Sequence, residues 1–230
     1  LALDVVKQIW NVTGSGGVNF SAVGGTETNC SGEVTPWGTT ITCEETTGNN
    51  TDANGDGYYD LGWCIEINPS TRKILDYGTS SPQKLWALGR MSHENVKVLP
   101  SDQKTVYFGE DEGDGSVYKF IADVAGDLSS GQLFVLKVDQ PLVNNEPVVS
   151  TGTWLLVPNT TKQERNDVKQ YALNAGATTF GGVEDVDVSP VDGMVYFAVK
   201  GPGRVYRFSD DGTTVSSFST FIGGQSYRIN

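Results

Sequence analysis

The stretch VYFGEDEGDGSVYKF, residues 106–120, recurs in altered form as VYFAVKGPGRVYRF, residues 195–208. In both copies, two segments that alternate aromatic and β-branched residues flank a turn built from glycine and small or charged residues. An alternation of period two is typical of β-strands, and glycine at the bend favours a hairpin. The repeat therefore predicts two β-hairpins.

A similar phrase precedes each hairpin: VKVLPSD at residues 96–102 and VDVSPVD at residues 186–192. Each phrase predicts a strand followed by a turn, and a strand, a turn and two further strands make up one blade of a β-propeller. Two looser units are also expected, one from Thr39–Thr42 with Trp63–Asn68 and one from Gln132–Val138 with Trp154–Val157.

This pattern predicts an all-β, propeller-like fold in one domain that spans residues 1–230. Blades of about 40 to 50 residues give about four blades in a chain of this length. Residues 46–60 and 144–180 are expected as insertions, and helical periodicity is confined to residues 161–173. About four blades would form only a partial or incomplete ring, which leaves strand edges unpaired. We therefore expect a protein partner or a missing chain segment to complete the ring.

The 28 acidic and 16 basic residues give a net charge of −12. Such a charge repels nucleic acid and attracts cations, although solubility alone would also account for it. No apolar run reaches the roughly 18 residues of a membrane span. Neither a glycine-rich phosphate loop nor a serine nucleophile elbow is present. Nucleic acid, membrane and nucleotide partners are therefore not expected.

The run TPWGTTITCEE, residues 35–45, places the thiol of Cys43 beside Glu44 and Glu45. Sulfur and carboxylate oxygen together can hold a transition metal next to calcium. Three cysteines cannot all pair. If Cys43 is a ligand, Cys30 and Cys64 remain as a possible disulfide.

The run DANGDGYYD, residues 52–60, resembles the first part of an EF-hand calcium loop. Oxygen donors would come from Asp52, Asn54, Asp56, the carbonyl group of Tyr58, and Asp60. Position 12 of the loop is Trp63 rather than the usual glutamate. A calcium loop and a plain surface turn both remain open.

Two further acidic clusters, Glu110–Asp114 and Glu184–Asp187, are compatible either with solvated turns or with an ion site. In a propeller, Asp111 and Glu184 would point toward the axis. The aromatic residues of the repeated hairpins are expected to form the core between blades.

Five phrases in this order resemble the PhoX-type alkaline phosphatase family: NCSGEVTPWGTTITCEE (29–45), LGRMSHEN (88–95), VYFGEDEGDGSVYKF (106–120), LSSGQLFVL (128–136) and GVEDVDVSPVDGMVYFAV (182–199). The resemblance implies a secreted β-propeller whose axial site holds iron and calcium and hydrolyses phosphate monoesters. It implies Cys43 as an iron-binding thiolate, with Glu44 or Glu45, Glu94 and Glu184 as carboxylate ligands.

The chain departs from the family at Gly182, where members usually carry an arginine that would clamp the phosphate. No catalytic residue is assigned, although Glu184 is a candidate. His93, the only histidine, is expected either at the metal or as a residue that orients Glu94. Two functions stay open: an extracytoplasmic, metal-dependent phosphatase, and a calcium-stabilised propeller that has lost catalysis and serves as a structural or docking subunit.

Overall fold

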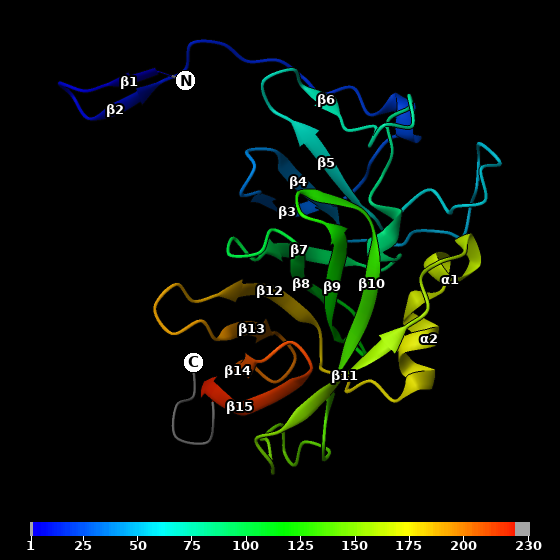
Figure 1. Ribbon diagram of the computed structural model, residues 1–230, viewed down its shortest axis with the longest axis vertical. Helices are drawn as coiled ribbons and strands as arrows, with labels where there is room; N and C mark the ends of the chain where they lie inside the picture. Colours follow the sequence, from blue (N-terminus) through cyan, green and yellow to red (C-terminus); the bar gives the residue numbers. More distant parts are fainter. Residues whose placement is uncertain (1, 224–230) are drawn as a thin grey trace.

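The computed structural model describes residues 2–223, which are almost entirely β-structure (Figure 1). Within these residues, three antiparallel units of four strands follow one another along the chain. The first unit contains β3 (Asn29–Val34), β4 (Thr40–Glu44), β5 (Cys64–Asn68) and β6 (Lys73–Ile74). The second contains β7 (His93–Val98), β8 (Thr105–Glu110), β9 (Val117–Val124) and β10 (Asp127–Val138). The third contains β12 (Val183–Val188), β13 (Val195–Val199), β14 (Arg204–Asp210) and β15 (Thr214–Ile222). The predicted all-β, propeller-like fold is confirmed.

The repeated sequence forms the middle hairpin of the second and third units. Strands β8 and β9 pair with Val106 opposite Phe120, and β13 and β14 pair with Val195 opposite Phe208. In the first unit, β4 pairs with β5, as expected for the looser unit. The alternation of period two therefore located these strands correctly, because it reflects which side chains face the core.

One additional strand, β11 (Gly152–Val157), joins the second and third units into a continuous nine-stranded sheet. It pairs with β10 over six residues and with β15 through Gly152 and Thr153. The segments Gln132–Val138 and Trp154–Val157, expected together in a fourth unit, do pair as parts of β10 and β11, but β10 is also the last strand of the second unit. β10 pairs along both of its edges, because residues 133–135 lie between β9 and β11.

The first strands of the three units lie next to one another. β7 packs beside both β3 and β12, and Figure 1 shows the three strands stacked along one side of the molecule. Between the second and third units, the side chain of Asn95 replaces a backbone partner: it donates to the carbonyl oxygen of Val186 (2.9 Å) and accepts from the Val186 N–H (3.0 Å). These bonds join the second and third units at the edge where their first strands meet.

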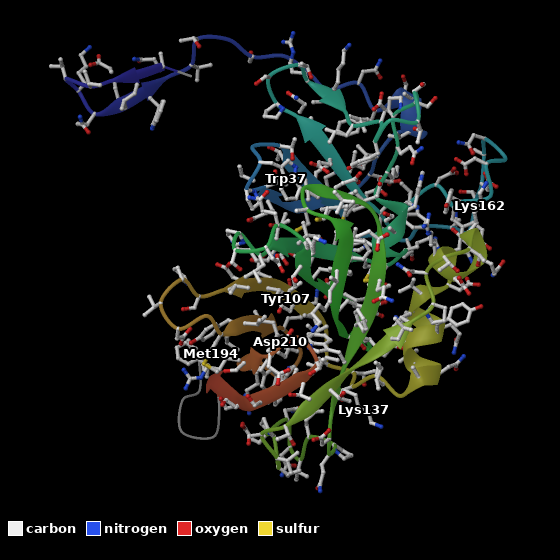
Figure 2. All side chains as sticks on the ribbon, in the orientation of Figure 1. Trp37, Tyr107, Lys137, Lys162, Met194 and Asp210 are labelled. Carbon is white, nitrogen blue, oxygen red and sulfur yellow. The ribbon has the colours of Figure 1, made fainter. Side chains whose placement is uncertain are left out.

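The aromatic residues of the repeat form the core, as expected. Tyr107 and Phe108 are neighbours on β8 and point to opposite faces, so Phe108 packs toward the first unit and Tyr107 toward the third. Tyr196 is the exception, because it is half-buried and donates its hydroxyl to Asp192. Tyr107 also donates a 2.8 Å hydrogen bond to Asp210 in the third unit, and Figure 2 shows the two residues close together.

The remaining elements lie outside the three units. The hairpin β1 (Ala2–Asp4) and β2 (Ile9–Asn11) projects away from the body, and the short 3-10 helices η1 (Ser21–Val23) and η2 (Trp86–Leu88) lie in connections (Figure 1). Helices α1 (Lys162–Asn166) and α2 (Val168–Ala175) occupy the segment with helical periodicity. Within residues 2–223, no helix combines the length and apolar character that crossing a bilayer requires.

Candidate metal centre

The second residue of each first strand points into a common centre. These residues are Cys30 on β3, Glu94 on β7 and Glu184 on β12. They occupy the same position because the three units are repeats of one another. Two more acids, Glu45 and Asp111, immediately follow the second strands β4 and β8. The site is therefore assembled from equivalent positions of separate units.

A β-bulge in each first strand lies at this position. Two residues of the first strand lie opposite a single residue of the second strand: 30–31 opposite Cys43, 94–95 opposite Gly109, and 184–185 opposite Ala198. Bulges twist a strand locally and redirect its side chains, and they are common beside active sites. The bulges explain why all three first strands turn a potential ligand toward the centre.

The ligand atoms form two overlapping sets that share Glu94. The first set, called here the thiol triad, contains Cys30, Glu45 and Glu94; the second, the carboxylate triad, contains Glu94, Asp111 and Glu184. Within each triad, the ligand atoms lie within 4.8 Å of one another. The Cys30 Sγ lies 3.1 Å from Glu94 Oε1. These separations are short enough for each triad to share one metal ion.

The electrostatics of the site also favour a cation. The pKa of Glu94 is raised to about 7, mainly by burial, with further contributions from the negative charges of Glu45 and Glu184. The pKa of Cys30 is raised to about 12, chiefly by its hydrogen bond to Glu94. A metal ion at the centre would reverse these shifts, because it stabilises carboxylate and thiolate forms.

Unsatisfied oxygen atoms provide a separate test of whether the residues fit a metal. Glu94 is only 6% exposed, and its Oε2 accepts no hydrogen bond from the described residues. The same is true of Asp111 Oδ1. A buried carboxylate oxygen without a partner costs free energy, and a bound cation would remove that cost. The donor set therefore fits a metal ion.

The structure does not bring Cys43 and Glu44 into this site. Cys43 is fully buried, with its Sγ 3.6 Å from the Sγ of Cys64 on the neighbouring strand. Glu44 is also buried and forms an ion pair with Lys84 at 2.7 Å. The thiol at the centre is Cys30 instead, and only Glu45 of the phrase around Cys43 reaches it.

The physical reason for this correction lies in the equivalence of the units. Cys43 occupies the position of Gly109 and Ala198, opposite the bulge, where the side chain faces the core. A signal for Cys30 was present in the sequence: aligning the first strands NCSGEV, HENVKV and VEDVDV places Cys30 in the column of Glu94 and Glu184. The same geometry keeps Cys30 away from Cys64, so the suggested disulfide between them is not formed.

His93 precedes Glu94 but faces the opposite side of β7. It is fully buried, and its Nε2 lies 2.8 Å from the carbonyl oxygen of Gly89. Burial lowers the pKa of His93 to about 4, so the ring is neutral at pH 7. His93 therefore lies outside both triads and anchors β7 to the preceding connection.

The residues of the proposed calcium loop also lie outside the triads. Their oxygen atoms accept hydrogen bonds from the loop's own backbone: Asp52 from the N–H groups of Asp56 (3.1 Å) and Gly57 (2.9 Å), and Asp60 from Ala53 (3.2 Å). Asp56 accepts from the N–H of Tyr58 at 2.8 Å, and Asn54 donates to Asp56 at 3.0 Å. Calcium binding by this loop stays a prediction.

Lys200 is a component that sequence reasoning missed. Its ammonium group lies 3.1 Å from Glu184 Oε1 and also pairs with Asp111. Within the described part of the chain, it is the cation paired with the carboxylate triad. Lys200 immediately follows β13, which is the position that Glu45 and Asp111 occupy in the other two units.

Comparison with known proteins agrees with this architecture. The family model described as alkaline phosphatase PhoX matches residues 10–213. No curated protein matches the sequence. A solved structure, Pseudomonas fluorescens PhoX in complex with vanadate, a transition state analogue, is similar with a TM-score of 0.65 and 23% identity.

The structural match covers 86% of this chain and 48% of the Pseudomonas chain, so the present chain spans about half the length of that protein. At this identity the structural likeness establishes the fold, and the family model, which matches most of the sequence, establishes the relationship. The chain belongs to the PhoX alkaline phosphatase family.

Proposed function

We propose that the chain is a metal-dependent phosphomonoester hydrolase of the PhoX type. The proposal rests on one observation: a thiol and four carboxylates from three separate units converge on one centre. The unsatisfied oxygens of Glu94 and Asp111 support it, because they have no partner among the described residues. Membership of the PhoX family supports phosphate esters as the substrate class.

The two triads differ in donor chemistry. The thiol triad combines sulfur with carboxylate oxygen, a set that suits a transition metal, and we assign it to iron. The carboxylate triad offers only oxygen, which suits calcium. When bound, the metal ions would act as Lewis acids on phosphoryl oxygens and lower the pKa of a bound water.

The protein's own residues would hold and orient these ions. Glu94 belongs to both triads and would fix the spacing between them. Glu184 is the more accessible of the two other carboxylate ligands, with a side chain 28% exposed against 6% for Asp111. Glu184 is therefore the candidate catalytic residue at the open side of the site. Gly182 has no side chain that could clamp a phosphate group.

The alternative is a catalytically impaired, calcium-stabilised propeller that acts as a structural or docking subunit of a larger assembly. The absence of a side chain at Gly182 is the observation that favours it. Under either function we propose an extracytoplasmic location, because the resemblance implies secretion. We also propose that a protein partner or further chain adds strands that complete the ring.

Metal analysis and a turnover assay on the purified chain distinguish the two functions. We expect iron and calcium to be bound, together with hydrolysis of p-nitrophenyl phosphate. Cys30→Ala should remove iron and activity, whereas the matched Cys43→Ala should keep both, once thermal melting has shown that each variant is folded. Calcium without iron and without turnover would favour the structural subunit. Loss of iron in Cys43→Ala alone would refute the assignment of Cys30.

A further inference from the structure

The third unit places a cation where the first two place an acid. The residue that follows the second strand is Glu45 in the first unit, Asp111 in the second and Lys200 in the third. All three side chains approach the same centre. The repeat therefore brings a lysine side chain into the ring of ligands that the other units build from acids.

The Lys200 backbone is anchored by hydrogen bonds, while its side chain is largely exposed. The Lys200 N–H donates to the carbonyl oxygen of Gly182 at 3.0 Å, and the next N–H, of Gly201, donates to Gly181 at 2.7 Å. In contrast, the Lys200 side chain is 58% exposed. Its ammonium group can therefore exchange carboxylate partners for solvent by side-chain rotation alone.

Gly182 makes room for this side chain. A Cβ atom at residue 182 would lie 3.0 Å from both Cγ and Cε of Lys200 and 2.8 Å from Asp111 Oδ1. The backbone at Gly182 also has φ of +82°, which disfavours other residues. The Lys200 side chain thus occupies the space that a side chain at residue 182 would need to enter the site. The present position of Lys200 therefore depends on glycine at residue 182.

The contacts of Lys200 coincide with those that a metal would make. Its two partners, Asp111 and Glu184, are two of the three members of the carboxylate triad. An ammonium group and a divalent cation cannot both occupy the space between these carboxylates. Asp111, whose side chain is 6% exposed, has little access to other cations while Lys200 is in place.

We propose that Lys200 is an internal counter-ion that competes with a divalent cation for Asp111 and Glu184 and so sets the calcium affinity of the site. The inference rests on the proposed function, since it concerns the same carboxylate triad. In the metal-free chain Lys200 neutralises part of the acidic cluster. When calcium binds, the ammonium group moves to the open side of the site, where it can face an anionic substrate.

Calorimetric titration of the metal-free chain with calcium tests the competition. Lys200 is itself exposed, so removing its two ion pairs should tighten calcium binding in Lys200→Met by roughly 2- to 30-fold. Lys200→Arg keeps the charge and should stay close to the wild-type affinity. Equal or weaker calcium binding in Lys200→Met overturns the proposal, as does the absence of calcium binding in both wild type and Lys200→Met.

Lys97→Met is the matched control. Lys97 also bridges two acids from different units, Glu33 at 3.2 Å and Asp187 at 3.1 Å, but neither acid belongs to the triads. Its substitution changes the net charge by the same amount and should leave calcium affinity close to the wild-type value. A similar gain in calcium affinity in Lys97→Met would show that the change in net charge alone explains the tighter binding of Lys200→Met, and would overturn the proposal.

A second measurement uses the wild-type chain. Acetylation by a small acylating reagent, followed by mass spectrometry, should modify Lys200 faster when calcium is present, because the released ammonium group is more accessible. Lys97 should react at the same rate with and without calcium. An unchanged rate at Lys200 in a chain that binds calcium overturns the proposal. A chain that shows the expected competition but hydrolyses no phosphate ester refutes the proposed function alone.

Discussion

The buried ion pair between Lys84 and Glu44 connects the stability of the first unit with the assignment of the metal ligands. Both side chains are 0% exposed, and the Lys84 Nζ lies 2.7 Å from Glu44 Oε1. The ammonium group also donates to the carbonyl oxygen of Asp60 at 2.8 Å. The second oxygen of Glu44 accepts from the N–H groups of Gly62 and Trp63, both at 3.0 Å. Glu44 therefore has its partners without a metal.

Lys84→Met removes the positive charge but keeps most of the apolar length of the side chain. Glu44 is then left as a buried carboxylate with only its two backbone donors. Removing one partner of a buried ion pair costs about 3–5 kcal/mol of unfolding free energy. For a chain of this size that corresponds to a fall in Tm of roughly 6–20 °C. The double variant Lys84→Met with Glu44→Gln should recover part of the loss, because the uncompensated charge is gone.

Urea unfolding and thermal melting measure these differences, and calcium and iron contents are determined on the same samples. Lys97→Met is a suitable comparison, because its ion pairs are partly exposed and each should contribute at most about 1 kcal/mol. We expect Glu44→Gln to lose stability and retain both metals. A Lys84→Met variant as stable as the wild type would refute the reasoning. So would a Glu44→Gln variant that loses metal while its stability is unchanged, since Glu44 would then be a ligand.

Three further predictions concern stability. Asn95→Ala removes both hydrogen bonds to Val186 between the second and third units, which should lower the urea-unfolding free energy by about 1–3 kcal/mol; an unchanged value would show that these bonds contribute nothing. Burial lowers the pKa of His93 to about 4, below its usual value of about 6.5, so the unfolded chain binds the extra proton between these pH values. The stability of the wild type relative to His93→Gln should therefore fall by about 3 kcal/mol from pH 7 to pH 4 in urea titrations, and a pH-independent difference would contradict the buried neutral ring. Thr161 caps α1 by accepting from the Glu164 N–H at 3.2 Å, so Thr161→Ala should cost about 1 kcal/mol in thermal melting, whereas Thr160→Ala should cost less.

Much of the fold was predictable because its signals are local. Alternation of aromatic and β-branched residues reports which side chains are buried, and glycine at the bend reports a turn, so the hairpins of residues 106–120 and 195–208 followed from a few residues each. The link that β11 makes to the third unit was not predictable. The pairing of β11 with β10 was expected from the sequence, but its pairing with β15 joins residues more than 60 positions apart, and nothing local to residues 152–157 specifies that β15 will lie beside them.

The candidate site also contains residues that the sequence predicted and residues that it did not. Glu94, Asp111 and Glu184 were expected together, and the structure brings their carboxylates within reach of one ion. Cys30 was missed in favour of Cys43. A thiol next to two glutamates looked like a ligand set along the chain. In the structure, Cys43 lies within β4 with its side chain in the core, and only Glu45, which follows the strand, reaches the centre.

The amino-acid order by itself determined the all-β units and their repetition. Only the tertiary structure decided which cysteine faces the centre and that Lys200 lies among the acids. One reason is that a β-bulge changes which face of the sheet the following side chains point to. The other is that the three first strands come together only through the packing of whole units. Both are properties of long-range pairing, so the residues of the two triads become neighbours only after the units have assembled.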